Sequence, residues 1–145
     1  MPRRTIAIGD IHGCAKALAA LIQAIEPTEG DLIVPLGDYV DRGPESRKVI
    51  DLLIDLVDRC QLVPLLGNHE AMMLAALDSA EVYEHWCRVG GRETLESYGG
   101  SLDDLPVEHL VFLRGLKQYH ETDSHIFVHA NYDAALSLEQ QPDRL

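Results

Sequence analysis

Three short apolar runs in the first half of this sequence each end in a glycine followed by a polar loop. The runs 5–8, 32–36 and 62–66 lead into the segments 9–13, 37–43 and 67–70. Apolar runs without polar alternation are typical of strands covered on both faces, as in parallel sheets. If the three runs are parallel strands of one sheet, their polar loops converge on the edge where open α/β sheets bind ligands.

Helical periodicity separates these predicted strands. Apolar residues at helical spacing predict one helix over 14–25 and a second from Pro44 to Cys60, since proline suits a first helical position. Alternating strands and helices predict an α/β fold with a parallel sheet. Pro35 and Pro64 would each remove a ladder hydrogen bond, so we place both at strand ends.

The second half has a mostly helical pattern. Short helices are predicted over 69–77, 81–89, 92–98 and 106–113, with Gly90 and Gly91 breaking the second from the third. Alternation over 117–121 and 125–128 around a polar turn predicts a hairpin, and the segment from Asn131 to Leu145 is polar and weakly patterned. No repeat or linker divides the chain, so 1–145 is interpreted as one domain.

Composition narrows the class of protein. A net charge of -12 and a pI near 4.8 argue against nucleic acid or an anionic membrane as the main partner. No apolar run approaches the ~20 residues that span a bilayer, and no signal-peptide core follows Met1. The three cysteines form no Cys-x-x-Cys pair, which favours a reduced, cytoplasmic protein. The sequence does not indicate an oligomeric state.

The polar loops carry the residue types of a two-metal site. Asp10 and His12 can bind one cation, and Asp38 can bridge it to a second through its two oxygens. Asn68 offers a neutral oxygen to the second ion, and His129, after the apolar run 126–128, offers an imidazole. Mixed oxygen and nitrogen ligands suit Mn, Fe or Zn better than Ca or Mg.

Three further side chains fit the chemistry of phosphate at such a site. Arg42 is placed to hold phosphate oxygens with its planar guanidinium. His69 beside Asp41 fits an acid that protonates a departing alkoxide, with the carboxylate orienting the ring. We predict direct attack on phosphorus by a hydroxide held between the two metals, without a covalent phosphoenzyme.

Each assignment has a structural alternative. The Gly-Asp and Gly-Asn pairs could be ordinary turns, Asp41 and Arg42 a surface ion pair, and His129 a core histidine. We interpret Glu70 as stabilising a helix N-terminus rather than binding metal. The remaining histidines match no motif and are interpreted as surface or packing residues: His85, His109, His120 and His125.

Three motifs in this order resemble the calcineurin-like metallophosphoesterases, and more narrowly the bacterial serine/threonine protein phosphatases. They are Gly-Asp-Ile-His-Gly (9–13), Gly-Asp-Tyr-Val-Asp-Arg-Gly (37–43) and Gly-Asn-His-Glu (67–70). The segments 90–100 and 127–133 resemble the bacterial branch. The resemblance implies an αββα sandwich, of which this chain is the N-terminal portion, and two transition-metal ions, Mn²⁺ foremost.

Residue by residue, the resemblance implies the same site. Metal ligands are Asp10, His12, Asp38, Asn68 and His129, phosphate is bound by Arg42, Asn68 and His69, and His69 with Asp41 forms the acid pair. Members of this family continue further, to a second phosphate-binding arginine and a final metal-binding histidine. No matching motif follows Asn131, so the resemblance implies a domain incomplete at its C-terminus and activity in doubt.

We therefore expect hydrolysis of phosphate monoesters, with phosphoserine or phosphothreonine in proteins or peptides as the substrate. One alternative is a dinucleoside-polyphosphate hydrolase of the same superfamily. A second is a truncated, inactive domain that only binds metal or phosphoprotein, and a third is a fragment that does not fold alone.

Overall fold

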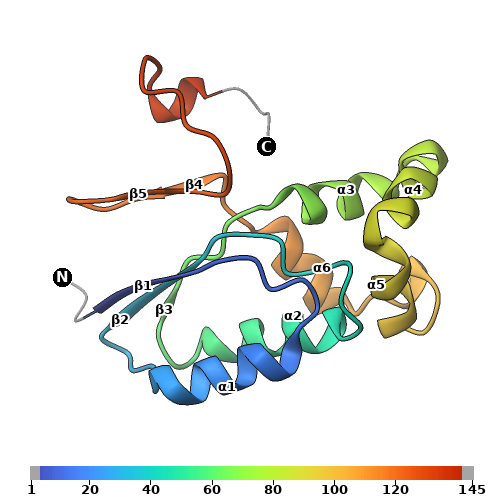
Figure 1. The fold of residues 1–145 in the computed structure, drawn as a ribbon, viewed down its shortest axis with the longest axis horizontal. Coiled ribbons are helices and arrows are strands. Elements are labelled where there is room, and N and C mark those ends of the chain that lie inside the picture. The colour runs from blue at the N-terminus through green and yellow to red at the C-terminus, as the bar shows by residue number, and fades with distance from the viewer. Residues whose placement is uncertain (1–3, 142–145) are drawn as a thin grey trace.

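The main sheet of the computed structural model, which describes residues 4–141, is three-stranded and parallel (Figure 1). Its strands are β1 (Arg4–Ile8), β2 (Asp31–Pro35) and β3 (Gln61–Leu62), in the order β1-β2-β3. Every residue of the central strand β2 is buried, as its continuous apolar run predicts. The predicted α/β class with a parallel sheet is confirmed.

The third strand is shorter than the predicted run 62–66. Beyond β3, the N–H of Val63 still donates to the carbonyl of Ile33, and that of Leu65 to the carbonyl of Pro35 (3.0 and 2.9 Å). Pro64 has no N–H, and its carbonyl accepts instead from Lys117 (3.0 Å). The segment therefore follows β2 without forming a regular ladder.

Different elements pack on the two faces of the sheet. Helices α1 (Ala15–Ile25) and α2 (Ser46–Leu56) lie on one face, and the antiparallel hairpin of β4 (Tyr119–Glu121) and β5 (Ile126–Val128) lies on the other (Figure 1). Phe127 of the hairpin packs on Val34 and Leu65 in a small cluster of its own. The predicted hairpin is thus present, with shorter strands.

Helix α2 begins two residues later than the predicted start at Pro44. The N–H of Glu45 donates to the carbonyl of Gly13 (3.0 Å), and the N–H of Asp41 donates to Oγ of Ser46 (3.2 Å). These bonds hold the segment before Ser46 against the loop that follows β1, so it cannot join the helix.

Four shorter helices extend from one end of the sheet: α3 (Asn68–Ala76), α4 (Ala80–Trp86), α5 (Arg92–Ser97) and α6 (Val107–Arg114). The segment Cys87–Gly91 joins α4 to α5 with a kink at Gly90, whose φ of 125° is not helical, so the chain breaks at the predicted glycine. Within residues 4–141, no helix has the length and apolar character needed to cross a bilayer. The predicted polar tail contains the 3₁₀ turn Leu138–Gln140, and 142–145 lie outside the described residues.

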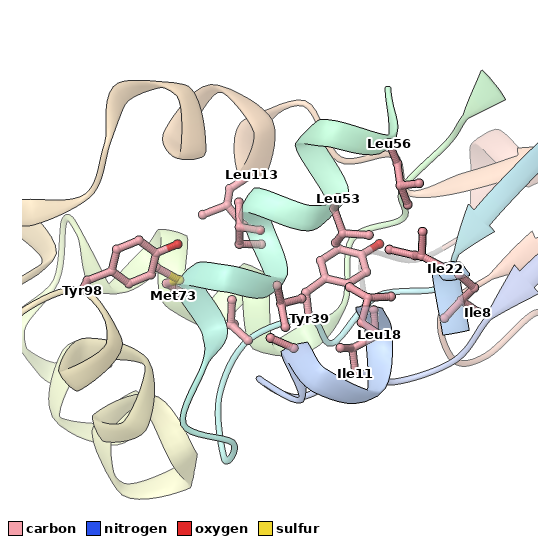
Figure 2. Packing of buried hydrophobic residues seen from close by; sticks show 14 of the residues in the cluster. Ile8, Ile11, Leu18, Ile22, Tyr39, Leu53, Leu56, Met73, Tyr98 and Leu113 are labelled. Carbon is pink, nitrogen blue, oxygen red and sulfur yellow. The ribbon is translucent and has the colours of Figure 1, made fainter. Parts of the chain in front are cut away.

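The main hydrophobic core lies between α1, α2 and the sheet and continues toward α3, α5 and α6 (Figure 2). Leu53 and Leu56 of α2 are fully buried and face Leu18 and Ile22 of α1. Tyr39 lies in the same core, and its hydroxyl donates to the carbonyl of Leu65 (2.6 Å). Because Tyr39 follows Asp38 directly, this packing anchors the loop that carries the predicted bridging carboxylate.

Candidate metal and phosphate site

The loops after β1, β2 and β5 and the start of α3 bring the predicted side chains together around Asp38. Oδ1 of Asp38 lies 3.4 Å from Nε2 of His129, and Oδ2 lies 3.6 Å from Nε2 of His12. The Asp38 side chain is only 7% exposed, so its charge has little solvent around it. A buried carboxylate needs a compensating partner.

Both histidines turn Nε2 toward this carboxylate. Nδ1 of His12 lies 2.9 Å from the carbonyl of Val40, and Nδ1 of His129 lies 2.7 Å from the carbonyl of Leu36. A carbonyl can only accept, so each Nδ1 carries the proton and the lone pair of the neutral ring is at Nε2. Metal-binding histidines are oriented in this way by the hydrogen bond at their other nitrogen.

Three possible metal-ligand atoms meet beside His129. Its Nε2 lies 3.1 Å from Oδ1 of Asn68 and 3.4 Å from Oδ1 of Asp38. With a neutral His129 ring, these three atoms can face one cation, while Oδ1 of Asp38 also accepts from the backbone N–H of His69 (3.2 Å). The nitrogen, amide oxygen and carboxylate set fits Mn, Fe or Zn.

Two groups of side chains have ligand atoms within 4.8 Å of one another: His12 with Asp38 and His69, and Asp10 with Asp38 and His129. Both groups contain Asp38, as expected of a bridging ligand. Asp10 lies with His129 in one group, and His12 lies with His69 in the other. Asn68 lies 3.1 Å from His129, so the predicted ligands lie together around Asp38.

Arg42 lies across the mouth of this cluster. Its Nη1 is 3.2 Å from Nε2 of His12, and its Nη2 is 3.1 Å from Nε2 of His69. A guanidinium has only donors, so both imidazole nitrogens accept from it. The exposed Arg42 side chain is thus placed to bind an anion at the same spot, as predicted for phosphate.

His69 and Asp41 form a buried pair behind the mouth. Nδ1 of His69 donates to Oδ2 of Asp41 at 2.7 Å, and both side chains are almost fully buried. Burial raises the pKa of Asp41, while the hydrogen bonds from His69, Thr94 and Trp86 act in the opposite direction. The pairing fixes the ring so that Nε2 of His69 points toward Arg42 and the cluster.

Unusual backbone geometry concentrates at the site. Within residues 4–141, four of the five non-glycine residues with positive φ are His12, Asp38, Asp41 and Arg42. Left-handed backbone at such residues is sparsely populated and persists where the surrounding structure enforces it. The two loops also touch, since a Cβ on Gly43 would overlap the carbonyl oxygen of His12.

Glu70 has a larger role than the predicted stabilisation of a helix N-terminus. Its fully buried carboxylate accepts from the N–H of Gly67 at the start of α3, as expected, and also from the N–H groups of Asp38, Tyr39 and Val40 (2.7 to 3.1 Å). Burial raises the pKa of Glu70 to about 7, opposed by these backbone bonds. Glu70 therefore fixes the loop that carries Asp38.

Among the histidines interpreted as surface or packing residues, His109 is fully buried and hydrogen-bonded at both nitrogens. Nδ1 lies 2.9 Å from the hydroxyl of Tyr98, and Nε2 lies 2.8 Å from Oδ1 of Asp51. The contacts tie α6 to α2 and α5. No local pattern signals such a triad, because its members are far apart in the sequence.

An α/β sheet whose loops collect carboxylates, imidazoles and an arginine in this way is the arrangement expected of a metallophosphoesterase fold. The family comparison agrees: the model of the calcineurin-like phosphoesterases matches residues 3–142, and the chain belongs to this family. The family resemblance expected from the three loop motifs is confirmed.

The symmetrical bis(5'-nucleosyl)-tetraphosphatase of Nitrosomonas europaea is 31% identical over 137 residues, covering 94% of this chain and 47% of that protein. A candidate diadenosine tetraphosphatase of known crystal structure is 26% identical and superposes with a TM-score of 0.73 over 99% of this chain and 58% of that one. A cold-active protein tyrosine phosphatase shares the fold, with a TM-score of 0.68 at 18% identity over 96% of this chain and 48% of that one. The chain thus spans about half the length of the curated relative.

Proposed function

We propose that this chain binds two divalent transition-metal ions, Mn²⁺ foremost, and hydrolyses the phosphoric anhydride of dinucleoside tetraphosphates. The metal ligands in this proposal are Asp10, His12, Asp38, Asn68 and His129. When bound, such ions would polarise a phosphoryl group and lower the pKa of an attacking water. The observation that carries the proposal is the meeting of lone pairs from His129, Asn68 and Asp38 around one point.

The chain's own residues then act on the substrate. Arg42 would exchange its contacts with His12 and His69 for two oxygens of the phosphoryl group, which its planar fork matches. Asn68 adds a contact to the same phosphoryl group. Nε2 of His69 faces this position and would give a proton to the departing oxygen, while Asp41 holds the ring.

The substrate class is supported by the relatives rather than by the geometry. The same site could cleave phosphoserine, phosphothreonine or an anhydride, because all present a tetrahedral phosphoryl group to Arg42. The curated relative is a symmetrical tetraphosphatase, which favours the alternative of a dinucleoside-polyphosphate substrate over a phosphoprotein. The protein phosphatase neighbour, at 18% identity, supports the fold alone.

Symmetrical cleavage consumes one water and divides the substrate into two equal halves. Water adds its oxygen to one of the two central phosphorus atoms, the bridging bond between them breaks, and the bridging oxygen leaves on the second half. Diadenosine tetraphosphate and water thus give two ADP. The leaving phosphate has a second pKa of about 6, far below that of a serine alkoxide, and needs less help from His69.

The test is a product analysis of the Mn²⁺-supplemented full chain with diadenosine tetraphosphate in ¹⁸O-water. We expect ADP as the only nucleotide product, with one label per two ADP, and no turnover after chelation or in the Asp38→Asn variant. Formation of AMP and ATP would contradict symmetrical cleavage. Release of phosphate from a phosphoserine peptide with no ADP formed would return the assignment to a protein phosphatase, and absence of both reactions would overturn the hydrolase proposal for this chain.

A further inference from the structure

The Asp41 carboxylate is enclosed by a ring of donors that the motif 37–43 does not contain. Oδ2 accepts from Nε1 of Trp86 at 2.8 Å in addition to His69, and Oδ1 accepts from Oγ1 of Thr94 at 2.8 Å. Asp41, Trp86 and Thr94 are all fully buried. With three donors on two oxygens, the carboxylate has no freedom to rotate away from His69.

The hydroxyl protons of this ring have fixed directions. The hydroxyl of Thr94 donates its one proton to Oδ1 of Asp41. Its oxygen therefore accepts from the N–H of Asp41 (2.8 Å) and from the hydroxyl of Ser46 (2.9 Å). The oxygen of Ser46 also accepts from the N–H of Asp41, at 3.2 Å. Every polar atom of the ring is therefore satisfied with Asp41 as the ionised acceptor.

Close packing holds Trp86 in this ring. A Cβ on Gly91 would overlap the indole, so the kinked segment Cys87–Gly91 passes directly against the ring face. The neighbouring Gly90, at φ 125°, accepts the N–H of Arg42 at its carbonyl (3.0 Å). One short segment therefore fixes both the indole that bonds Asp41 and the backbone of Arg42.

From these contacts we infer that Trp86 and Thr94 are positioning residues for the Asp41–His69 pair: they hold the carboxylate that orients the proton-donating ring. The inference rests on the proposed function, since it assumes that His69 protonates the leaving group. It extends that function to helices α4 and α5, which lie outside the three loop motifs. Both side chains are fully buried, so we expect neither to touch the substrate.

A positioning role has a kinetic signature that loss of structure lacks. A general acid contributes most to the rate when the leaving group is poor. The comparison is therefore between two substrates. Phenyl phosphate releases a phenol with a pKa of about 10, as in tyrosine, and p-nitrophenyl phosphate releases a far more acidic phenol. In Thr94→Val and Trp86→Phe we expect kcat for phenyl phosphate to fall about 10- to 100-fold and kcat for p-nitrophenyl phosphate less than about 3-fold. Thr94→Ser, which keeps the hydroxyl, should restore the wild-type ratio, and Thr5→Val, on exposed β1, is the matched control.

An equal loss of kcat on both substrates, in variants that still unfold cooperatively, would overturn the inference. A second measurement needs no turnover, so it decides the case in which the wild-type chain hydrolyses neither phenyl ester and also the separate case in which it does not cleave dinucleoside tetraphosphates. The chain has a single tryptophan and hence one indole N–H signal in a ¹⁵N spectrum of the metal-free protein. Thr94→Val and Asp41→Asn should each shift this signal and the ring signals of His69, whereas unchanged signals in Thr94→Val would show that no shared carboxylate links them.

Discussion

Glu70 accepts the backbone N–H of Asp38 at 2.8 Å, so one buried carboxylate holds the backbone of another. The two lie 32 positions apart in the sequence, Glu70 in the first turn of α3 and Asp38 in the loop after β2. The same side chain also accepts from Tyr39, Val40 and Gly67. The left-handed conformation of Asp38 is thus enforced by a group that does not itself face the metal cluster.

Replacing Glu70 with glutamine tests this role. The amide keeps the size of the side chain but turns two accepting positions into donors, which then face backbone N–H groups in a buried place. We expect the free energy of unfolding to fall by about 2–4 kcal/mol. Urea denaturation measures it, with Glu29→Gln on an exposed turn as control, and a variant as stable as the control would contradict the role.

The sheet and the gathering of the site were predictable because each depends on local sequence. Apolar runs and helical spacing give the order of β1, β2 and the flanking helices, and parallel strands must present their C-terminal loops at one edge. His129 also follows from its place after an apolar run. The candidate ligands therefore lie in short contiguous motifs that a single sequence displays.

The supports of the site could not be predicted in the same way. Trp86 and Thr94 reach Asp41 across 45 and 53 positions, and no spacing rule links an indole on one helix to a loop that far away. The start of α2 was misplaced for a similar reason, since the bond from Glu45 to Gly13 competes with helix formation. Tertiary hydrogen bonds decided these features, and a single sequence does not display them.

Acid should weaken the fold through Asp31. The Arg4 guanidinium donates two hydrogen bonds to this buried carboxylate and Thr28 donates two more, which hold the pKa of Asp31 well below its usual range. The unfolded chain binds a proton here near pH ~3.9 while the folded chain does not. This contribution to stability is therefore complete above that pH and is lost as pH falls.

We expect the free energy of unfolding to fall between about pH 5 and about pH 3. The fall should be shallower in Asp31→Asn. Denaturant titrations at several pH values measure the slope. Asp123→Asn, on the exposed turn of the β4–β5 hairpin, should keep the wild-type slope. An unchanged slope in Asp31→Asn would show that other carboxylates cause the acid sensitivity.

Because the loop after β1 contacts the loop after β2, alanine substitutions at two glycines should differ in their effect on stability. A Cβ on Gly43 would overlap the carbonyl oxygen of His12, whereas a Cβ on Gly9 would have no atom within 4 Å. Gly43→Ala should lower the free energy of unfolding by about 2–4 kcal/mol, and Gly9→Ala should stay within about 0.5 kcal/mol of wild type. Thermal and urea unfolding of the two variants make the comparison, and equal stabilities would mean that the loops do not touch in solution.

Replacing Asp38 and replacing His69 should affect metal binding differently, although the structure places both residues beside His12. Asp38 belongs to both groups of candidate ligands, so Asp38→Asn should weaken both Mn²⁺ sites by at least about 10- to 100-fold, the loss typical even of an outer partner. His69 donates from Nδ1 to Asp41, and its Nε2 faces Arg42. In the proposed role it carries a proton rather than a metal, so His69→Asn should keep both sites.

Calorimetric titration of the metal-free full chain with Mn²⁺ measures the number of sites and their affinities. Exposed positions supply matched controls, Asp58→Asn for the carboxylate and His85→Asn for the imidazole. Loss of one site in His69→Asn would make this histidine a ligand beside His12, as the grouping of His69 with His12 and Asp38 allows. Asp41 and Trp86 would then orient a metal ligand. In that case Thr94→Val should bind Mn²⁺ more weakly as well as turn over more slowly, whereas the acid role predicts slower turnover alone.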